Sequence, residues 1–225
     1  LGIGALPDAV CSFLGEKHDL GLHSEMISDG ILPLLESGVI TGRRKQRDTG
    51  KITVTFLMGT RRLYDYVDNN PLIRMLPVDI CNDPAVISQN DNVVSINSCV
   101  EVDLQGQVCA EAIGLRQISG IGGQMDFVRG ANLSRGGRSI IALHSTTNDG
   151  SASKIVPTLT TGAPVTTSRC DVNYIVTEYG VAQLRGQTLR ERARRLITIA
   201  HPSFREQLAA EYEQRFGEKL PLSPV

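Results

Sequence analysis

One glutamate has the residue type and the setting for covalent chemistry on an acyl group. The segment 20–30, LGLHSEMISDG, has the pattern of a short strand that ends in a polar turn, with Glu25 at the end of the strand. Ligands of α/β proteins bind beyond the carboxyl ends of the strands. A glutamate is ordinarily ionised at neutral pH, and its carboxylate can attack a thioester to give a mixed anhydride. The alternative, which the spacing alone favours, is that Glu25 caps a helix or lies in an exposed turn.

Two glycine-rich loops could provide the backbone N–H groups that such a reaction needs. One precedes a predicted helix from Pro7 to Lys17, and the other lies at 119–127, SGIGGQMDF. Glycine lets the backbone approach a ligand closely, and fixed N–H donors stabilise a developing oxyanion. The alternative for the first loop is a tight turn that only needs small residues, and a lone GxG does not decide between the two. The candidate donors are Gly2, Ile3 and Gly4 in the first loop and Gly120, Gly122, Gly123 and Gln124 in the second.

The other reactive residue types indicate no second catalytic centre. The sequence has no GxSxG motif, and none of its five cysteines lies beside a histidine, so no serine or cysteine triad is predicted. The odd cysteine count, the irregular spacing and the absence of CxxC favour a reduced, cytoplasmic protein over a disulfide scaffold or a zinc site. The four histidines have no metal-ligand spacing, and we expect no bound metal.

Composition excludes several classes of partner. The formal net charge is -1, which gives no electrostatic basis for binding nucleic acid or an anionic membrane. No apolar run approaches the length of a membrane span. The 225 residues suffice for one large domain with a full core and are few for two. Because the chain begins with leucine inside a predicted functional loop, we expect a fragment, the C-terminal part of a longer polypeptide.

The hydrophobic patterns predict a mixed α/β sheet covered by helices. The basic segment 41–50 is expected to be a solvated surface loop rather than a phosphate site. Cys99 and Cys109 are expected to be two packed thiols within an antiparallel hairpin or meander. The predicted helices span 30–38, 61–69, 189–200 and 203–215, and the predicted strands span 51–57, 92–97, 100–104, 107–112, 138–144 and 172–177.

Several motifs in the same order resemble one known family. They are GIGALPDAV at 2–10, LGLHSEMISDG at 20–30, VVSINSCVEVDLQGQV at 93–108, SGIGGQMDFVRGA at 119–131, SKIVP at 153–157, VNYIVTEYGVAQLRG at 172–186 and IAHPSFR at 199–205. The chain resembles the C-terminal domain of the acetyl-CoA hydrolase/transferase family, which includes 4-hydroxybutyrate and butyrate:acetate CoA-transferases. The motifs cover nearly the whole chain.

The resemblance implies a ping-pong transfer of coenzyme A through Glu25. The glutamate would attack acyl-CoA to form an acyl-glutamyl anhydride. The CoA thiolate would then attack the anhydride, leaving a glutamyl-CoA thioester and releasing the first carboxylate, and an incoming carboxylate would repeat the steps in reverse. Both glycine loops would supply oxyanion donors and contacts to CoA. Further residues implied near CoA or its loop are Asn82, in a segment that resembles the family's N-x-P turn, and Lys154, Arg129 and Asp126.

The resemblance also implies two similar α/β domains in tandem, of the type found in ribose-5-phosphate isomerase, with the active site in the cleft between them. Residues 1–225 would be the C-terminal domain without its N-terminal partner domain, and the enzyme would be a homodimer. Its substrates would be acyl-CoA and small carboxylic acids, with no permanently bound cofactor. Glu178, in the TEYG motif, would join a strand to a helix rather than act on substrate. A hydrolase that uses the same glutamate and a CoA-binding domain without turnover of its own are the alternatives.

Overall fold

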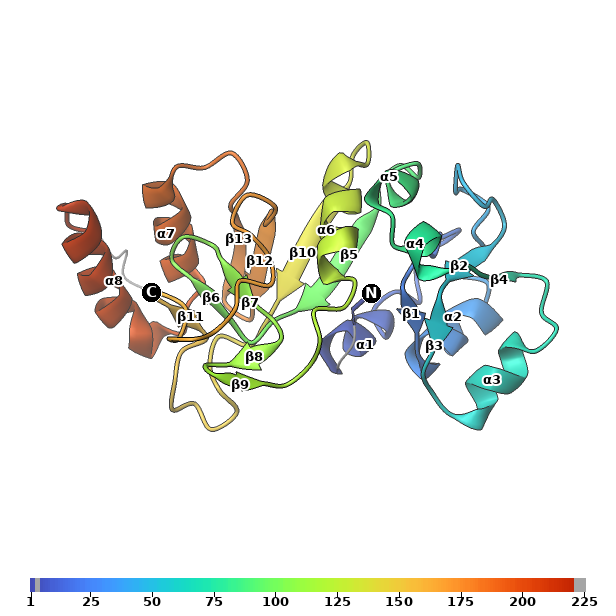
Figure 1. Ribbon diagram of the computed structural model, residues 1–225, viewed down its shortest axis with the longest axis horizontal. Helices are drawn as coiled ribbons and strands as arrows, with labels where there is room; N and C mark the ends of the chain where they lie inside the picture. The colour runs from blue at the N-terminus through green and yellow to red at the C-terminus, as the bar shows by residue number, and fades with distance from the viewer. Residues whose placement is uncertain (3–4, 221–225) are drawn as a thin grey trace. The chain divides into compact units, whose positions relative to one another are not determined.

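The chain divides into two compact units, each with its own hydrophobic core. The structure, a computed structural model, describes residues 1–2 and 5–220 (Figure 1). Unit 1 comprises Leu1–Asn97 and Asp126–Ser139, and unit 2 comprises Ser98–Met125 and Ile140–Val225. In the part of the chain so described, no helix is long and apolar enough to cross a membrane.

Unit 1 is built from short parallel strand pairs and short helices. Strand β1 pairs with β3, and β2 pairs with β4, both in parallel. The core is a cluster of buried aliphatic side chains that includes Ile27, Leu32, Ile52 and Leu63. Its elements are α1 (Ala5–Cys11), β1 (Met26–Ile27), the 3-10 helix η1 (Asp29–Ile31), α2 (Leu32–Glu36), β2 (Ile52–Val54), β3 (Phe56–Leu57), α3 (Arg61–Val67), β4 (Ile73–Met75), α4 (Val78–Cys81), α5 (Pro84–Ile87) and most of β5 (Val94–Ser98) and α6 (Gln124–Leu133).

Unit 2 is built from strands of two mixed sheets and a short β8–β9 pair, with helices packed against one shared core. Strand β12 is parallel to β10 and antiparallel to β13, and β6 is parallel to β11 and antiparallel to β7. Figure 1 shows α7 between α8 and these strands, and buried Leu196 and Tyr212 of the two helices join one core with Ile141 and Ile175 of the sheet. The elements are β6 (Glu101–Asp103), β7 (Val108–Cys109), β8 (Ala112–Ile113), β9 (Arg116–Gln117), most of β10 (Arg138–Ala142), β11 (Ile155–Val156), β12 (Tyr174–Thr177), β13 (Gly180–Gln183), α7 (Leu189–Thr198) and α8 (Pro202–Phe216).

Much of the predicted secondary structure is confirmed. The mixed α/β fold, the helices at 61–69, 189–200 and 203–215, and the antiparallel hairpin β6–β7 all occur. Cys99 and Cys109 are buried free thiols, as predicted. The register of β6–β7 pairs Glu101 with Cys109 and Val102 with Val108, and Gly106 lies in the turn with φ +83°.

Several elements differ from the prediction. The first helix ends at Cys11 rather than Lys17, because the N–H groups of Ser12, Phe13 and Leu14 bond carbonyls three residues back, in tight turns. The segment 51–57 forms two strands that pair with different partners rather than one. Neither α6 nor β13 was predicted. Glu178 therefore lies in the turn of a hairpin, and not between a strand and a helix.

Candidate active site

Glu25 directly precedes β1 instead of ending a strand, so its predicted place in the local structure is wrong. Among the described residues before it, strand-like pairing is limited to single-residue bridges at Leu20 and His23. The carbonyl oxygen of Glu25 accepts the N–H groups of Thr55 at 3.0 Å and Phe56 at 3.1 Å, and its side chain is half-buried. The backbone of this glutamate is thus anchored to the chain between β2 and β3.

Three of the residues singled out in the sequence come together in unit 1. Asn82 is 6% exposed and donates a side-chain hydrogen bond to Asp126, in the first turn of α6. Burial raises the pKa of Asp126 above its ordinary value, and the charge of Glu25 adds to this shift, while Asn82 and Arg129 oppose it. Asn82 Oδ1 is buried without a hydrogen-bond partner among the described residues. Glu25, Asn82 and Asp126 therefore form one electrostatically coupled group with a spare buried acceptor.

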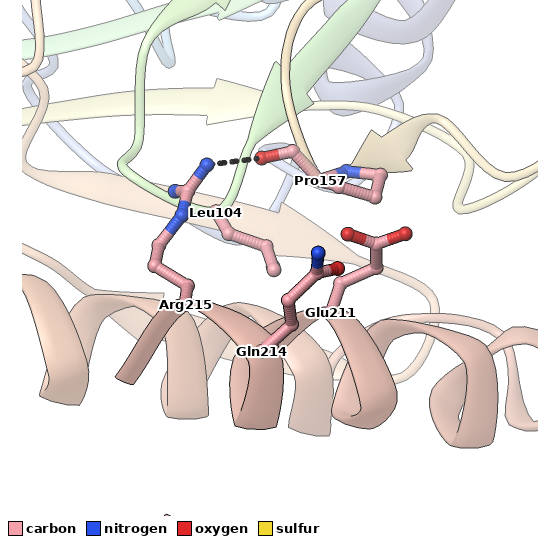
Figure 2. Close-up of a pocket in the computed structure, with 5 residues that line it drawn as sticks. All are labelled: Leu104, Pro157, Glu211, Gln214 and Arg215. Carbon is pink, nitrogen blue, oxygen red and sulfur yellow. Dashed lines mark hydrogen bonds between the residues drawn. The ribbon is translucent and has the colours of Figure 1, made fainter. Parts of the chain in front are cut away.

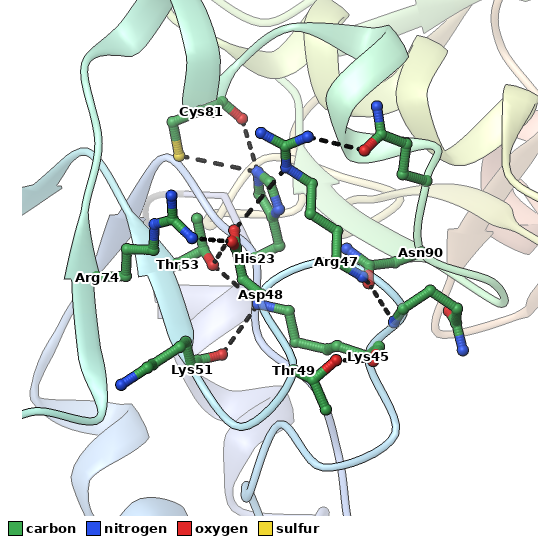
Figure 3. A network of polar contacts seen from close by, with 12 residues as sticks. His23, Lys45, Arg47, Asp48, Thr49, Lys51, Thr53, Arg74, Cys81 and Asn90 are labelled. Carbon is green, nitrogen blue, oxygen red and sulfur yellow. Dashed lines mark hydrogen bonds and ion pairs between the residues drawn. The ribbon is translucent and has the colours of Figure 1, made fainter.

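A cysteine and a histidine also meet beside Glu25, although they are far apart in the sequence. The His23 Nε2–H donates to the carbonyl oxygen of Cys81 at 2.7 Å, and Cys81 Sγ lies 3.9 Å from the same nitrogen (Figure 3). The thiol instead donates to the Ser24 carbonyl at 3.3 Å. Burial, followed by the charge of Glu25, raises the pKa of the Cys81 thiol to about 11, and burial lowers the pKa of His23. The pair is neutral at neutral pH and is not a nucleophilic dyad.

Lys45 is the buried residue that the sequence reasoning missed. It lies in the basic segment 41–50, and Arg43 and Arg44 of that segment are exposed, as predicted for a solvated loop. Lys45 is only 7% exposed, and for it the prediction is wrong. Its Nζ donates to the carbonyl oxygens of Leu22 at 3.0 Å and Lys51 at 2.9 Å and to Thr53 Oγ1 at 2.8 Å. No local sequence signal distinguishes this lysine from its basic neighbours.

One carboxylate partly compensates this buried charge. Asp48 Oδ2 accepts the hydroxyl of Thr53 at 3.1 Å and lies 3.9 Å from Arg47 Nε, and Oδ1 pairs with Arg74 (Figure 3). Burial lowers the pKa of Lys45 from its ordinary 10.5 to about 8, and the attraction of Asp48 opposes this only in part. The polar groups of this cluster are thus hydrogen-bonded, but burial still disfavours the charged form of Lys45.

The first glycine loop does not present the donor that was predicted at Gly2. The Gly2 N–H donates to the carbonyl oxygen of Ile96 at 2.7 Å, so it is already engaged. A Cβ at position 2 would lie 2.7 Å from Asn97 Oδ1, which explains the need for glycine there as close packing. Ile3 and Gly4, the other two candidates of this loop, lie outside the described residues.

The second glycine loop lies in unit 2 and has open space around it. Gly120 and Gly122 are exposed, and a Cβ at either position would meet no atom within 4 Å. Gly122 has φ +61°, a conformation that favours glycine. Gly123 is buried, and Gln124 begins α6 and donates from Nε2 to Thr167 Oγ1 at 3.0 Å. The loop therefore runs directly into a helix N-terminus.

Lys154 and Glu178, also in unit 2, are both connected to Ser145. The Lys154 N–H donates to the Ser145 carbonyl at 2.8 Å. The carboxylate of Glu178 accepts the Ser145 N–H at 2.9 Å and its hydroxyl at 2.6 Å. Glu178 thus ties the β12–β13 turn to the segment that follows β10.

A pocket of about 310 Å³ in unit 2 contains none of the predicted site residues. Figure 2 shows its lining, where Arg215 of α8 donates to the carbonyl oxygen of Pro157 at 3.4 Å. The lining residues are Leu104, Pro157, Glu211, Gln214 and Arg215. One cation and one carboxylate on an open helix face do not provide the features needed for acyl transfer.

Comparison with known proteins places these residues in a family. Residues 59–212 match the acetyl-CoA hydrolase/transferase C-terminal domain. The 4-hydroxybutyrate coenzyme A transferase of Clostridium kluyveri is 63% identical over 96% of this chain and 50% of its own length. The butyryl-CoA:acetate CoA-transferase of Anaerostipes caccae is 48% identical over 95% of this chain and 49% of its length.

A solved structure agrees with the sequence comparisons. The 4-hydroxybutyrate CoA-transferase of Porphyromonas gingivalis superimposes with a TM-score of 0.82 at 47% identity, over 96% of this chain and 50% of that one. The chain spans about half the length of the relatives that it matches. It belongs to the acetyl-CoA hydrolase/transferase family, and its residues 59–212 match that family's C-terminal domain.

Proposed function

We propose that this chain, over residues 1–225, is the C-terminal domain of a CoA-transferase that moves CoA between an acyl-CoA and a small carboxylate. Acetate, butyrate and 4-hydroxybutyrate are the kinds of carboxylate concerned. The observation that carries the proposal is the place of Glu25, a half-buried carboxylate with an anchored backbone, coupled to Asp126 and Asn82. The relatives named as CoA-transferases, at 63% and 48% identity, support the reaction type.

The reaction proceeds by ping-pong chemistry on the carboxylate of Glu25. An oxygen of Glu25 attacks the thioester carbonyl carbon of acyl-CoA, the C–S bond breaks, and CoA leaves as the thiolate. The thiolate then attacks the carbonyl carbon of Glu25 in the mixed anhydride, and the first carboxylate leaves. A glutamyl-CoA thioester remains. The second carboxylate attacks this thioester, and the same steps in reverse deliver a new acyl-CoA.

The chain's own groups serve two needs of this chemistry. Each tetrahedral intermediate carries an oxyanion, which donors of the loop Gly120–Gln124 stabilise; losing one such donor typically slows a reaction by about 10²–10³. Asn82, whose Oδ1 has no partner within the described chain, accepts an N–H of the pantetheine arm. Lys154 is assigned to CoA, while Arg129 and Asp126 order the loop and the carboxylate group.

The complete enzyme needs more than this chain. We assign it an N-terminal domain of similar fold, which contributes part of the carboxylate pocket, a homodimeric state and a cytoplasmic location. CoA and acyl-CoA act as substrates, and the reaction requires no metal or permanently bound cofactor, because each step exchanges carboxylate and thiolate alone.

Hydrolysis is the alternative outcome at the same glutamate. If water attacks the glutamyl-CoA thioester, the protein is an acyl-CoA hydrolase, and the family includes both activities by name. The transferase and the hydrolase differ only in whether water reaches the thioester. A CoA-binding domain that forms no adduct at Glu25 is the third possibility.

The test is to trap the covalent intermediate. The full-length protein is incubated with butyryl-CoA without an acceptor and treated with borohydride, and its peptides are mapped by mass spectrometry. A CoA adduct, or reduction of the side chain to an alcohol, on the peptide that contains Glu25 is expected, and Glu25→Gln should show neither. If butyryl-CoA binds and no adduct forms, the glutamate is not the nucleophile, and the binding-domain alternative holds. Breakdown of the adduct is then compared with and without acetate. Formation of acetyl-CoA only when acetate is added indicates transfer, and release of free CoA without acetate indicates hydrolysis.

A further inference from the structure

We infer that Lys45 is a positioning residue, which holds the segment that carries Glu25 and thereby sets the rate at which this carboxylate attacks the thioester. The inference rests on the proposed function, because it concerns the same reaction. Lys45 does not act on the acyl group itself. It acts through the backbone of residues 22–25.

Every residue of the segment 22–25 makes a hydrogen bond to another part of unit 1, and Lys45 bonds the first residue of the segment. The carbonyl oxygen of Leu22 accepts both Lys45 Nζ at 3.0 Å and the Thr53 N–H at 3.2 Å. Ser24 N–H donates to the Thr53 carbonyl at 3.0 Å, and the Glu25 carbonyl accepts two N–H groups from the chain after β2. Lys45 thus holds Leu22 directly and Thr53 through its hydroxyl.

The lysine bonds two stretches of chain, residue 22 and residues 51–53, and adds to the backbone hydrogen bonds between them. Its three ammonium protons are all used, on the carbonyl of Leu22 before Glu25, on the carbonyl of Lys51 just before β2 and on the hydroxyl of Thr53 in β2. The backbone at Gly21 comes so close to this side chain that a Cβ there would lie 2.7 Å from Lys45 Cγ. A flexible or exposed lysine would not need such a fit, so the stem as well as the charge is held in one place.

Stability alone is a poor reason for a charge at this position. Burying an ammonium is unfavourable, and apolar replacements of buried charges are often neutral or stabilising. What an apolar side chain cannot supply is three directed donors at fixed distances. Reaction rates depend on such geometry, since a displacement of about 1 Å can slow a reaction on the order of 10²-fold.

The charge of Lys45 also predicts how the rate depends on pH. Among the groups that face it, Asp48 and Cys81 favour the ammonium, Arg74 disfavours it, and His23 is neutral. With a pKa of about 8, Lys45 loses one of its three donors as the pH rises past that value. Between about pH 8 and its ordinary pKa of 10.5, Lys45 binds more protons in the unfolded chain than in the folded protein. The contribution of this group to the free energy of unfolding therefore increases as the pH rises, while the loss of a donor loosens the segment 22–25. Rate and stability therefore change in opposite directions.

The experiment measures the first half-reaction in the full-length protein, as the rate of glutamyl-CoA formation from butyryl-CoA across pH 6.5–9.5, a range chosen about the pKa of about 8. Lys45→Met removes the donors, and Lys45→Arg keeps a charge that does not titrate. Lys51→Met is the matched control, because it removes a nearby lysine whose Nζ donates to the carbonyl of Pro71 rather than to the segment 22–25. CoA binding and the melting temperature are measured for each.

At neutral pH, Lys45→Met should form the adduct about 10–100-fold more slowly, with binding of CoA retained and Lys51→Met unchanged. The fall of rate above pH 8 should be present in the native protein and absent from both Lys45 variants. Adduct formation at the native rate in folded Lys45→Met would overturn the inference, as would an unchanged fall of rate in that variant. If Lys45→Met does not fold, Thr53→Val, which removes one acceptor of the ammonium, provides the same test. A native protein that forms no adduct refutes the proposed function instead.

Discussion

Burial has the same effect on four titratable side chains near Glu25. It raises the pKa of Asp126 and Cys81 and lowers the pKa of His23 and Lys45, and in each case burial is the largest cause. All four shifts favour the neutral form. Water therefore solvates charge poorly around Glu25, and fixed protein dipoles must take its place during the reaction.

Removal of the glutamate side chain is the first test at this scale. Glu25→Ala should abolish transfer from butyryl-CoA to acetate, because in the proposed mechanism the anhydride and the thioester both form on this carboxylate. Binding of CoA should be nearly intact, since the backbone contacts of residue 25 do not involve its side chain. Transfer is measured as the amount of acetyl-CoA formed, and CoA binding is measured by calorimetry. Normal turnover in the variant would rule out the mechanism.

A second prediction concerns Asp126 and the pH dependence of stability. Because its pKa is raised in the folded protein, Asp126 makes the protein less stable as the pH rises through the interval between its ordinary pKa and the folded one. Asp126→Asn should therefore melt at a higher temperature than the native protein at pH 7, and this gain should vanish in acid, where both are uncharged. Asp65→Asn, at an exposed ion pair of α3, is the control and should lack this pattern. A gain that persists in acid contradicts the assignment.

Sequence alone could indicate Glu25 as a candidate and could not indicate the burial of Lys45, for a physical reason. Glu25 lies in a motif whose residue types are tied to a reaction, and family resemblance carries that information. The burial of Lys45 depends on three oxygens that the fold brings to it from residues 22, 51 and 53. No pattern within the basic segment encodes that convergence.

At the scale of elements, α6 shows why a helix can go unpredicted from the sequence. Its buried face, at Phe127, Val128 and Ala131, has helical spacing. Gly130 interrupts the signal, because an interior glycine costs a helix about 1 kcal/mol relative to alanine. The structure explains why residue 130 is a glycine, since a Cβ there would lie 2.5 Å from Cγ2 of Ile87 in α5. The two helices approach too closely for any side chain.

This close packing gives a stability prediction. Gly130→Ala should destabilise the protein by about 1–3 kcal/mol, because overpacking forces the helices apart despite the better helix propensity of alanine. Ile87→Ala should also be destabilising, by about 2–5 kcal/mol, through the cavity that it leaves. The double variant should be more stable than the sum of the two predicts, since each change relieves the other. Denaturant unfolding measures all three, and simple additivity would show that the two residues do not compete for space.

At the scale of the molecule, the sequence indicated the fold class but not the division into two units. Continuous and alternating apolar strands predict a mixed sheet, and β10, β12 and β13 form one. The division depends on which distant parts of the chain pack together, as when residues 126–139, which include most of α6, join unit 1 after the chain has entered unit 2. No local sequence pattern indicates such long-range packing.

The length of the chain relative to its relatives gives a prediction about activity. The chain spans about half of each relative, and we assign part of the carboxylate pocket to a further domain. Residues 1–225 alone should therefore bind CoA but form no adduct with butyryl-CoA, whereas the full-length protein should form it. Trapping with borohydride under identical conditions compares the two. An adduct on the isolated chain at the full-length rate would mean that the site is complete without that domain.

The distribution of the thiols makes the protein suited to site-selective labelling. Of its five cysteines only Cys170 is exposed, while Cys11, Cys81, Cys99 and Cys109 are buried. Alkylation needs an accessible thiolate, so a maleimide dye should attach once per native chain and five times after unfolding, as intact mass will show. Cys170 lies in unit 2, and a fluorophore there would report on that unit while leaving the neighbourhood of Glu25 chemically untouched.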